Sequence, residues 1–277
     1  MTLRLATIRT PDGHRCVRID SDQAIEVGAA DVVELLQDPG WRTRTEGAAG
    51  AGHDLASLDF APLVPRPEKI ICVGLNYAAH IREMGRELPE VPTFFAKFHR
   101  ALIGANDEIS LPAVSQAVDW EAELAIVVGH PLRNASPDEA TASIAGFTVV
   151  NDITGRDWQY RTTQWLQGKT FEATTPVGPY LVVPERAEPA PGYEIVCAVD
   201  GEVMQSANTS DLVFNPATLL SYLSEIITLV PGDLIATGTP GGVGHGRDPK
   251  RYLKDGSLVV TTIEGIGECR NHCRATA

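Results

Sequence analysis

The sequence predicts an α+β fold that is mainly β, with a small N-terminal β-containing domain before a larger one. Three observations lead to this prediction. Short apolar runs alternate with Gly- and Pro-containing turns along most of the chain, helical patterns are few, and repeating βαβ units are absent from the pattern. A chain of 277 residues has room for one large domain and a small one.

The small domain is expected to span residues 1–65. Its expected elements are a hairpin of Leu3–Ile8 and Cys16–Ile19 around the turn Pro11–His14, a helix at Ala30–Leu36, and a small-residue loop at Gly47–Gly52. The proline-bearing stretch Pro62–Pro67 marks the predicted boundary.

The larger domain is expected to span residues 66–277. Its predicted strands are Ile70–Val73, Leu124–Val128, Phe147–Val150, Tyr180–Val183, Ile195–Val199, Leu234–Ala236 and Leu258–Thr261. Its predicted helices are Ala78–Met84, Pro137–Ile144 and Pro216–Ile227, the last opened by a proline in its first turn.

Composition narrows the classes of function. The net charge of −13 argues against nucleic-acid binding, which needs a basic face. No apolar run approaches the roughly 20 residues of a membrane span, and the first residues lack a secretory signal, so we expect a cytoplasmic protein with no membrane partner. The five scattered cysteines are expected to be free thiols rather than a disulfide framework.

Familiar nucleotide-binding loops are missing. Gly168-Lys169-Thr170 resembles the end of a phosphate-binding loop, but Thr163 stands where that loop requires its first glycine. The glycine-rich segment Gly238–Gly246 lacks the dinucleotide-binding spacing. These absences weaken the kinase and dehydrogenase hypotheses.

Two acidic motifs predict a metal site. Glu121 and Glu123 are two residues apart and would project from one face of a strand that continues into a strongly apolar run. Asp152 follows the apolar run Phe147–Val150, so a third carboxylate at a strand end can converge on the pair. Carboxylate oxygens of this kind suit Mg²⁺ or Mn²⁺, with Ca²⁺ as a further possibility. An ordinary solvent-facing strand edge is the alternative for the glutamate pair alone.

Three further side chains are candidate catalytic residues. His80 and Glu83 are three apart on a predicted helical turn, where a carboxylate can orient an imidazole that activates water. Lys169 lies among Gly and Pro residues and can bind an oxyanion in a cleft. The alternatives are a surface ion pair for the first two and a solvated lysine for the third.

The chain resembles the fumarylacetoacetate hydrolase family in six segments that follow the family's order. These segments are Val73–His80, Asp119–Leu124, Asn151–Gln159, Gln167–Phe171, Asn208–Asp211 and Pro231–Pro240. The resemblance covers roughly residues 69 to 272 and implies a mixed β-roll catalytic domain assembled as a homodimer.

The resemblance also implies roles for the candidate residues. It implies that Glu121, Glu123 and Asp152 bind the metal, that His80 and Glu83 activate water, and that Lys169 stabilises an enolate or carboxylate. Gln159 and Thr239 would contact the substrate. We interpret Arg156 and Asp157 as a structural ion pair that supports the metal loop. The far end of the substrate is expected to meet residues 85–92 and 161–166.

Hydrolysis of a C–C bond in a 2,4-dioxo acid, of acylpyruvate or fumarylpyruvate type, is the first functional hypothesis. The products would be pyruvate and a carboxylic acid. The alternatives on the same platform are oxaloacetate decarboxylation or tautomerisation, and isomerisation of 2-hydroxyhepta-2,4-diene-1,7-dioate in aromatic catabolism. A hypothesis from another class is a binding protein that has lost catalysis.

Overall fold

The structure is a computed structural model of the chain that describes residues 2–83, 85–184 and 192–276. The N-terminal region forms the predicted hairpin, because β1 (Arg4–Thr10) and β2 (Gly13–Asp20) pair antiparallel. β3 (Gln23–Glu26) and β4 (Gly52–Asp54) extend it. The predicted first helix is confirmed as α1 (Val32–Leu36), and α2 (Trp41–Glu46) was not predicted.

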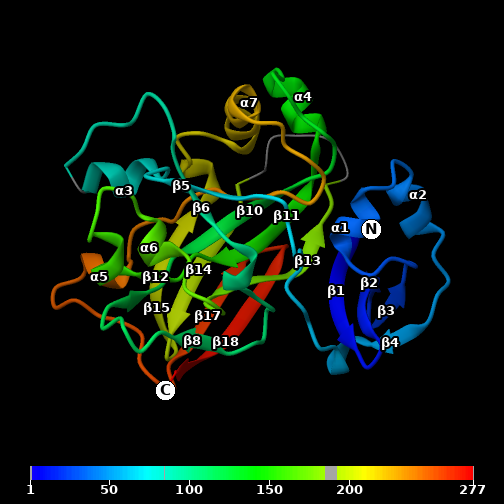
Figure 1. Cartoon of the computed structure of the whole chain (residues 1–277), viewed down its shortest axis with the longest axis horizontal. Helices are drawn as coiled ribbons and strands as arrows, with labels where there is room; N and C mark the ends of the chain where they lie inside the picture. The colour runs from blue at the N-terminus through cyan, green and yellow to red at the C-terminus, as the bar shows by residue number, and fades with distance from the viewer. Residues whose placement is uncertain (1, 84, 185–191, 277) are drawn as a thin grey trace.

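The largest sheet runs across the molecule, from the N-terminal strands to β5 and β6 (Figure 1). Its strand order is β4-β3-β2-β1-β13-β11-β10-β16-β5-β6, and β7 pairs with β13. The added strands are β5 (Ile70–Gly74), β6 (Thr93–Lys97), β7 (Leu102–Ile103), β10 (Ala122–Val128), β11 (Ile144–Asn151), β13 (Thr175–Val182) and β16 (Leu234–Ala236). Since β1 pairs with β13, the N-terminal strands continue this sheet. The division at residues 65 and 66 stays a prediction.

A second sheet of five strands has the order β15-β14-β17-β18-β8. Its strands are β8 (Ile109–Leu111), β14 (Glu194–Val199), β15 (Glu202–Asn208), β17 (Leu258–Ile263) and β18 (Gly267–Ala275). It packs against β10, β11 and β13 of the large sheet, and β9 (Val118–Asp119) pairs with β12 (Thr154–Gly155). Both sheets contribute to one apolar core, which confirms the mainly β fold.

The helices lie outside the sheets (Figure 1). They include α3 (Ala78–Glu83), α4 (Pro137–Ala142), α5 (Arg156–Gln159), α6 (Leu166–Lys169) and α7 (Pro216–Ile226), with 3-10 turns at Leu55–Ser57, His99–Ala101, Thr209–Asp211 and Gly244–Gly246. The helix predicted to reach Ile144 ends at Ala142, because Ile144 begins the buried strand β11. Met84, the predicted end of the third helix, lies outside the described residues.

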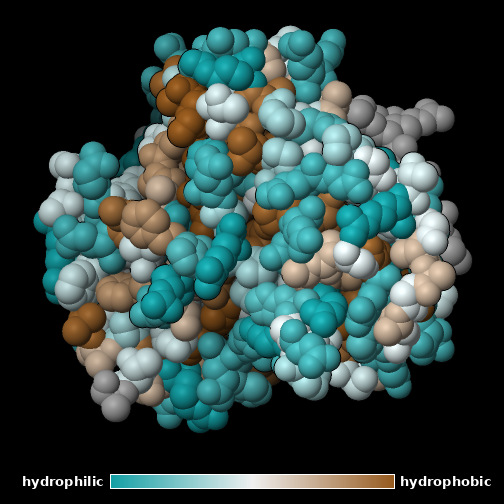
Figure 2. Space-filling model, turned by 45° about the vertical axis from the view of Figure 1, so that its right-hand side comes forward, coloured by the Kyte–Doolittle hydropathy of each residue, from teal (hydrophilic) through white to brown (hydrophobic). Residues whose placement is uncertain are grey.

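The five cysteines are free and buried, as predicted. No helix among the described residues is long and apolar enough to cross a membrane. Hydrophilic residues cover most of the face in Figure 2, and apolar groups are visible near its top, at the height of α4 and α7.

Candidate active site and metal centre

Three carboxylates meet where β10 and β11 lie side by side. Glu123 lies in β10, Glu121 precedes that strand directly, and Asp152 follows β11 directly. The antiparallel pairing of Ala122 with Asn151 places the end of one strand at the start of the other. One oxygen of each carboxylate lies within 4.8 Å of the others, and all three residues are buried. The structure therefore brings the three predicted ligands together.

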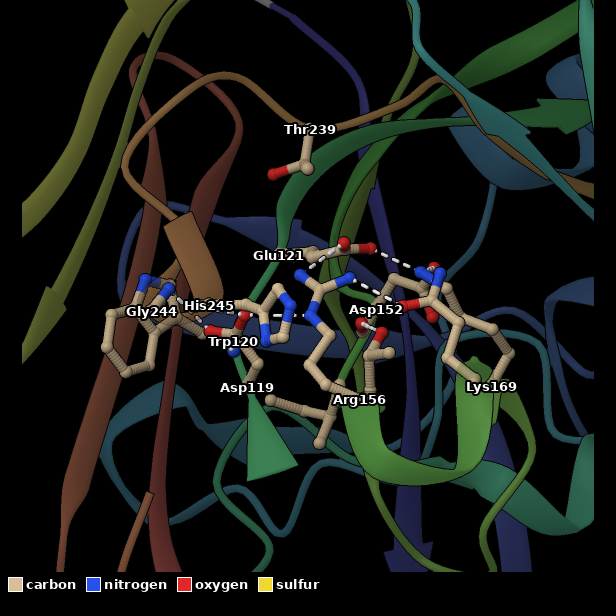
Figure 3. Close-up of polar contacts among 12 residues, drawn as sticks. Asp119, Trp120, Glu121, Asp152, Arg156, Lys169, Thr239, Gly244 and His245 are labelled. Carbon is tan, nitrogen blue, oxygen red and sulfur yellow. Dashed lines mark hydrogen bonds and ion pairs between the residues drawn. The ribbon is translucent and has the colours of Figure 1, made fainter. Parts of the chain in front are cut away.

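Three buried cations hold two of these carboxylates. Lys169 Nζ donates to Glu121 and lies 2.7 Å from Asp152 Oδ2, while Lys97 Nζ lies 2.6 Å from Asp152 Oδ1. On the other side of Glu121, Arg156 Nη2 lies 2.7 Å from Oε1 (Figure 3). Such charge-assisted contacts fix the orientation of the carboxylates. Lys97 was not identified from the sequence, where one lysine at the end of an apolar strand carries little signal.

The acidic residues differ in their electrostatics. Burial alone would raise the pKa of Asp152, but the ammonium groups of Lys169 and Lys97 outweigh it and hold that pKa at about 2. Glu123 accepts a hydrogen bond from Gly238 N at 2.8 Å and pairs with no cation among the described residues. Burial, reinforced by the charges of Asp152 and Glu121, raises the pKa of Glu123 well above its usual value.

The donor set fits a divalent cation. With all four ionised, the buried carboxylates, counting Asp119, outnumber the three buried cations by one negative charge. A divalent cation would turn this excess into one positive charge, which suits an anionic substrate. Since the ligands are all carboxylate oxygens, the set favours a hard cation such as Mg²⁺ or Mn²⁺.

Asp119 and Arg156 form a pair that was not predicted. Arg156 Nε lies 2.8 Å from Asp119 Oδ2, so its guanidinium bridges Asp119 and Glu121. The interpretation of Arg156 and Asp157 as an ion pair is wrong. Asp157 instead accepts hydrogen bonds from Ser115 Oγ at 2.6 Å and from Gln116 N at 3.1 Å. Asp119 lies in the same acidic motif as Glu121 and Glu123, and this position is the feature of the sequence that could have identified it as a site residue.

Asp119 also anchors the glycine-rich segment. Its carboxylate accepts hydrogen bonds from Gly244 N at 2.7 Å and His245 N at 2.9 Å (Figure 3). A Cβ at Gly244 would lie 1.9 Å from Arg251 O and 2.8 Å from Asp119 Oδ1. Glycine is therefore needed for this close approach, and the segment forms a wall of the site rather than a nucleotide loop.

His80 and Glu83 face the same site from α3. The His80 Nδ1 atom lies 3.9 Å from Glu83 Oε2, and the Glu83 side chain is 71% exposed. Burial lowers the pKa of His80, and the nearby carboxylates of Glu83 and Glu121 offset this in part. The imidazole is therefore neutral at pH 7 and can accept a proton, while its contact with Glu83 is longer than a hydrogen bond.

Many of these groups line a cavity of about 350 Å³. Its wall includes the two glutamates of the triad, the residues His80, Glu83, Arg156, Gln159, Lys169 and Thr239, and Trp165 from the predicted 161–166 segment. None of the residues 85–92 lines it in the described structure.

Both predicted substrate contacts have partners inside the protein. Gln159 Oε1 accepts a hydrogen bond from Arg156 Nη1 at 2.9 Å. Thr239 Oγ1 donates to Ala122 O at 2.9 Å and accepts from Gln205 Nε2 at 2.8 Å. The Thr239 hydroxyl proton is thus already used, so this group can offer a substrate only an acceptor. Their roles as substrate contacts stay predictions.

Known proteins resemble this chain in sequence and in structure. The family model described as fumarylacetoacetate (FAA) hydrolase, C-terminal, matches residues 69–274. The mitochondrial oxaloacetate tautomerase FAHD2A of Bos taurus is 45% identical over 214 residues, which cover 76% of this chain and 68% of that protein.

Two solved structures have the same fold over nearly their whole length. The 5-carboxymethyl-2-hydroxymuconate delta-isomerase of Mycobacterium smegmatis is 34% identical with a TM-score of 0.82, covering 99% of each chain. The fumarylacetoacetate hydrolase of Exiguobacterium antarcticum is 30% identical with a TM-score of 0.86, covering 99% of this chain and 100% of that one.

Proposed function

The chain belongs to the fumarylacetoacetate hydrolase family, and we propose that it catalyses the metal-dependent keto–enol tautomerisation of a small 2-oxo acid such as oxaloacetate. The observation that carries this proposal is a neutral imidazole, His80, in one cavity with Glu121 and Glu123 of the buried acidic triad. Keto–enol tautomerisation is one of the alternatives predicted from the sequence, and it replaces C–C hydrolysis, the first hypothesis. The relative that is named an oxaloacetate tautomerase matches at higher identity than the relative that is named a hydrolase.

Tautomerisation needs a polarised 2-oxo group and a base for the proton on C3. A divalent cation held by Glu121, Glu123 and Asp152 would polarise that oxygen and so acidify the C3 proton. His80 accepts the proton at its imidazole, which burial keeps neutral. Lys169 donates a hydrogen bond toward the negative charge that develops on the 2-oxo oxygen, and the proton that His80 holds then moves to that oxygen.

The geometry favours this chemistry over hydrolysis. Hydrolysis needs a water activated by His80 with Glu83 orienting the ring, but these side chains lie 3.9 Å apart and Glu83 is mostly exposed. Tautomerisation requires only that the imidazole of His80 reach the proton on C3 of the substrate. Arg156 and Lys97 act through the carboxylates, because both hold the ligands in place.

An ultraviolet assay of enol decay after oxaloacetate is dissolved tests the proposal, with Mg²⁺, with Mn²⁺ and with EDTA. We expect faster equilibration with either metal and the uncatalysed rate in EDTA. The His80→Ala variant should lose at least about 100-fold in rate, the lower end of what a general base contributes. The matched variant Glu83→Gln should stay within a few-fold.

Two parallel assays separate the other reactions of this family. Pyruvate release from acylpyruvates reports hydrolysis, and pyruvate release from oxaloacetate reports decarboxylation. No acceleration of enol decay with either metal, together with acylpyruvate cleavage that depends on Glu83, would overturn the proposal in favour of the hydrolase. The homodimer and the cytoplasmic location stay predictions, and the tautomerase relative is mitochondrial by name.

A further inference from the structure

We propose that Arg247 binds a second, distal carboxylate of the substrate and makes the site selective for 2-oxo dicarboxylates over 2-oxo monocarboxylates. This inference rests on the proposed function, because it concerns the end of the substrate that the acidic triad does not bind. Arg247 directly follows the 3-10 turn Gly244–Gly246 and lines the same cavity as Glu121 and Glu123 of the triad. Arg247 was not among the site residues predicted from the sequence.

The charges of the cavity wall single out Arg247. Three permanent cations line the cavity in the described chain. Lys169 is held by Glu121 and Asp152, and Arg156 by Asp119 and Glu121. Arg247 forms no ion pair with any described carboxylate. Its hydrogen bonds go to neutral backbone carbonyls, Met204 O at 2.8 Å and Gly242 O at 3.3 Å. Its positive charge is therefore available to an anionic ligand.

The guanidinium is held in place before a ligand arrives. Nε and Nη2 donate to the two carbonyls, and three of the five N–H groups remain for a carboxylate. The Gly242 carbonyl also accepts a hydrogen bond from Trp120 Nε1 at 3.3 Å. A Cβ at Gly242 would lie 2.1 Å from Met204 O, so only glycine allows the segment to lie this close to β15. A fixed arginine loses little side-chain entropy on binding.

The same segment is tied to the metal site. Asp119 accepts the Gly244 and His245 N–H groups and holds Arg156, which in turn contacts Glu121 (Figure 3). A short series of hydrogen bonds and ion pairs thus fixes the position of Arg247 relative to the triad. A substrate whose 2-oxo acid end lies at the triad meets Arg247 with its other end in the same cavity. A carboxylate there forms a charge-assisted pair, whereas a methyl group leaves the arginine without a partner.

The test compares oxaloacetate with 2-oxobutanoate, which has the same four carbons and no distal carboxylate. Deuterium exchange at C3, followed by NMR, gives kcat and KM for both acids in the Mg²⁺-loaded enzyme. Arg247→Gln keeps an amide donor for Met204 O and removes the charge. We expect it to raise KM for oxaloacetate roughly 10- to 100-fold, the range for a hydrogen bond to a charged group. KM for 2-oxobutanoate should change less than about twofold.

Two more variants make the comparison specific. Arg247→Lys keeps the positive charge but lacks the forked N–H donors of the guanidinium. Its affinity for oxaloacetate should therefore lie between those of Arg247→Gln and wild type. Arg251→Gln is the matched control, since Arg251 pairs with Asp200 and Glu202 and does not line the cavity. It should leave both KM values unchanged. Equal effects of Arg247→Gln on the two acids, or no effect on either, would refute the role of Arg247.

A binding measurement separates this inference from the proposed function. Calorimetry with oxalate, which offers only the chelating end, is compared with 3,3-difluoro-oxaloacetate, which has both ends and no C3 proton. Arg247→Gln should weaken the second ligand at least about 10-fold and leave oxalate unchanged. If Arg247→Gln shows this selective loss but the wild-type enzyme does not exchange C3 protons, the tautomerase proposal is refuted and the role of Arg247 is supported. If wild type and Arg247→Gln bind difluoro-oxaloacetate equally well, only the proposed role of Arg247 is refuted.

Discussion

Glu123 is a buried carboxylate that pairs with no cation among the described residues, and Glu123→Gln isolates the free-energy cost of burying its unpaired charge. Because burial raises its pKa in the folded chain, the folded state binds one more proton than the unfolded state between the two pKa values. The free energy of unfolding of the metal-free protein should therefore fall as pH rises from about 4.5, by up to about 1.4 kcal/mol per pH unit from this group. The glutamine variant removes that dependence and is the more stable protein in EDTA.

A bound metal should act in the opposite direction and stabilise wild type more than Glu123→Gln. At a free Mg²⁺ concentration of about 100 times its dissociation constant, binding adds about 2.7 kcal/mol to the wild-type stability. For a chain of this length the melting temperature should rise by about 5 °C. Glu123→Gln loses one of three ligands, so it should gain far less. Wild-type protein is thus expected to be the less stable in EDTA and to gain more from Mg²⁺.

The assay is urea and thermal unfolding from pH 5 to 8, in EDTA and in saturating Mg²⁺, with Glu121→Gln as the contrasting variant. Glu121 is held by Lys169 and Arg156, so its neutralisation leaves two buried cations short of a partner. It should cost about 3 kcal/mol, the lower end for breaking a buried pair. If Glu123→Gln and wild type share one pH slope in EDTA and one response to Mg²⁺, the electrostatic account of the triad is wrong.

Two further predictions follow from the cations and from His80. Lys97→Met should destabilise the metal-free protein by about 3 kcal/mol at pH 7, since it removes a buried partner of Asp152. The variant should also raise the pKa of Asp152 from its depressed value. Urea unfolding at neutral and acidic pH measures both the loss of stability and this rise in pKa. In a pH profile of kcat/KM, activity should be present above the pKa of His80 and be lost as pH falls through it. Burial lowers that pKa, so the acid limb should lie below pH 6.5, and a limb above it would contradict the assignment.

Local patterns were enough to predict much of the fold. The hairpin at the N-terminus, the apolar strands of the large sheet and the helix that begins at Pro216 each depend on residues close together in the chain. The same holds for the acidic triad, because spacing on a strand places Glu121 beside Glu123 and an apolar run ends at Asp152. The short helices α5 and α6 were missed, since four residues carry too little periodic signal.

Local sequence patterns were thus sufficient to predict the mainly β architecture and the three metal-ligand candidates. The groups that hold and surround these ligands became known from the folded chain. Lys97 meets Asp152 across 55 residues, Arg156 meets Asp119 across 37, and Gly244 meets Asp119 across 125. Pairings of this range depend on how the strands pack, which no local spacing encodes. For the same reason the carboxylates of the triad could be found from a short motif, while Arg247, the proposed partner of a distal carboxylate, became visible only in the folded chain.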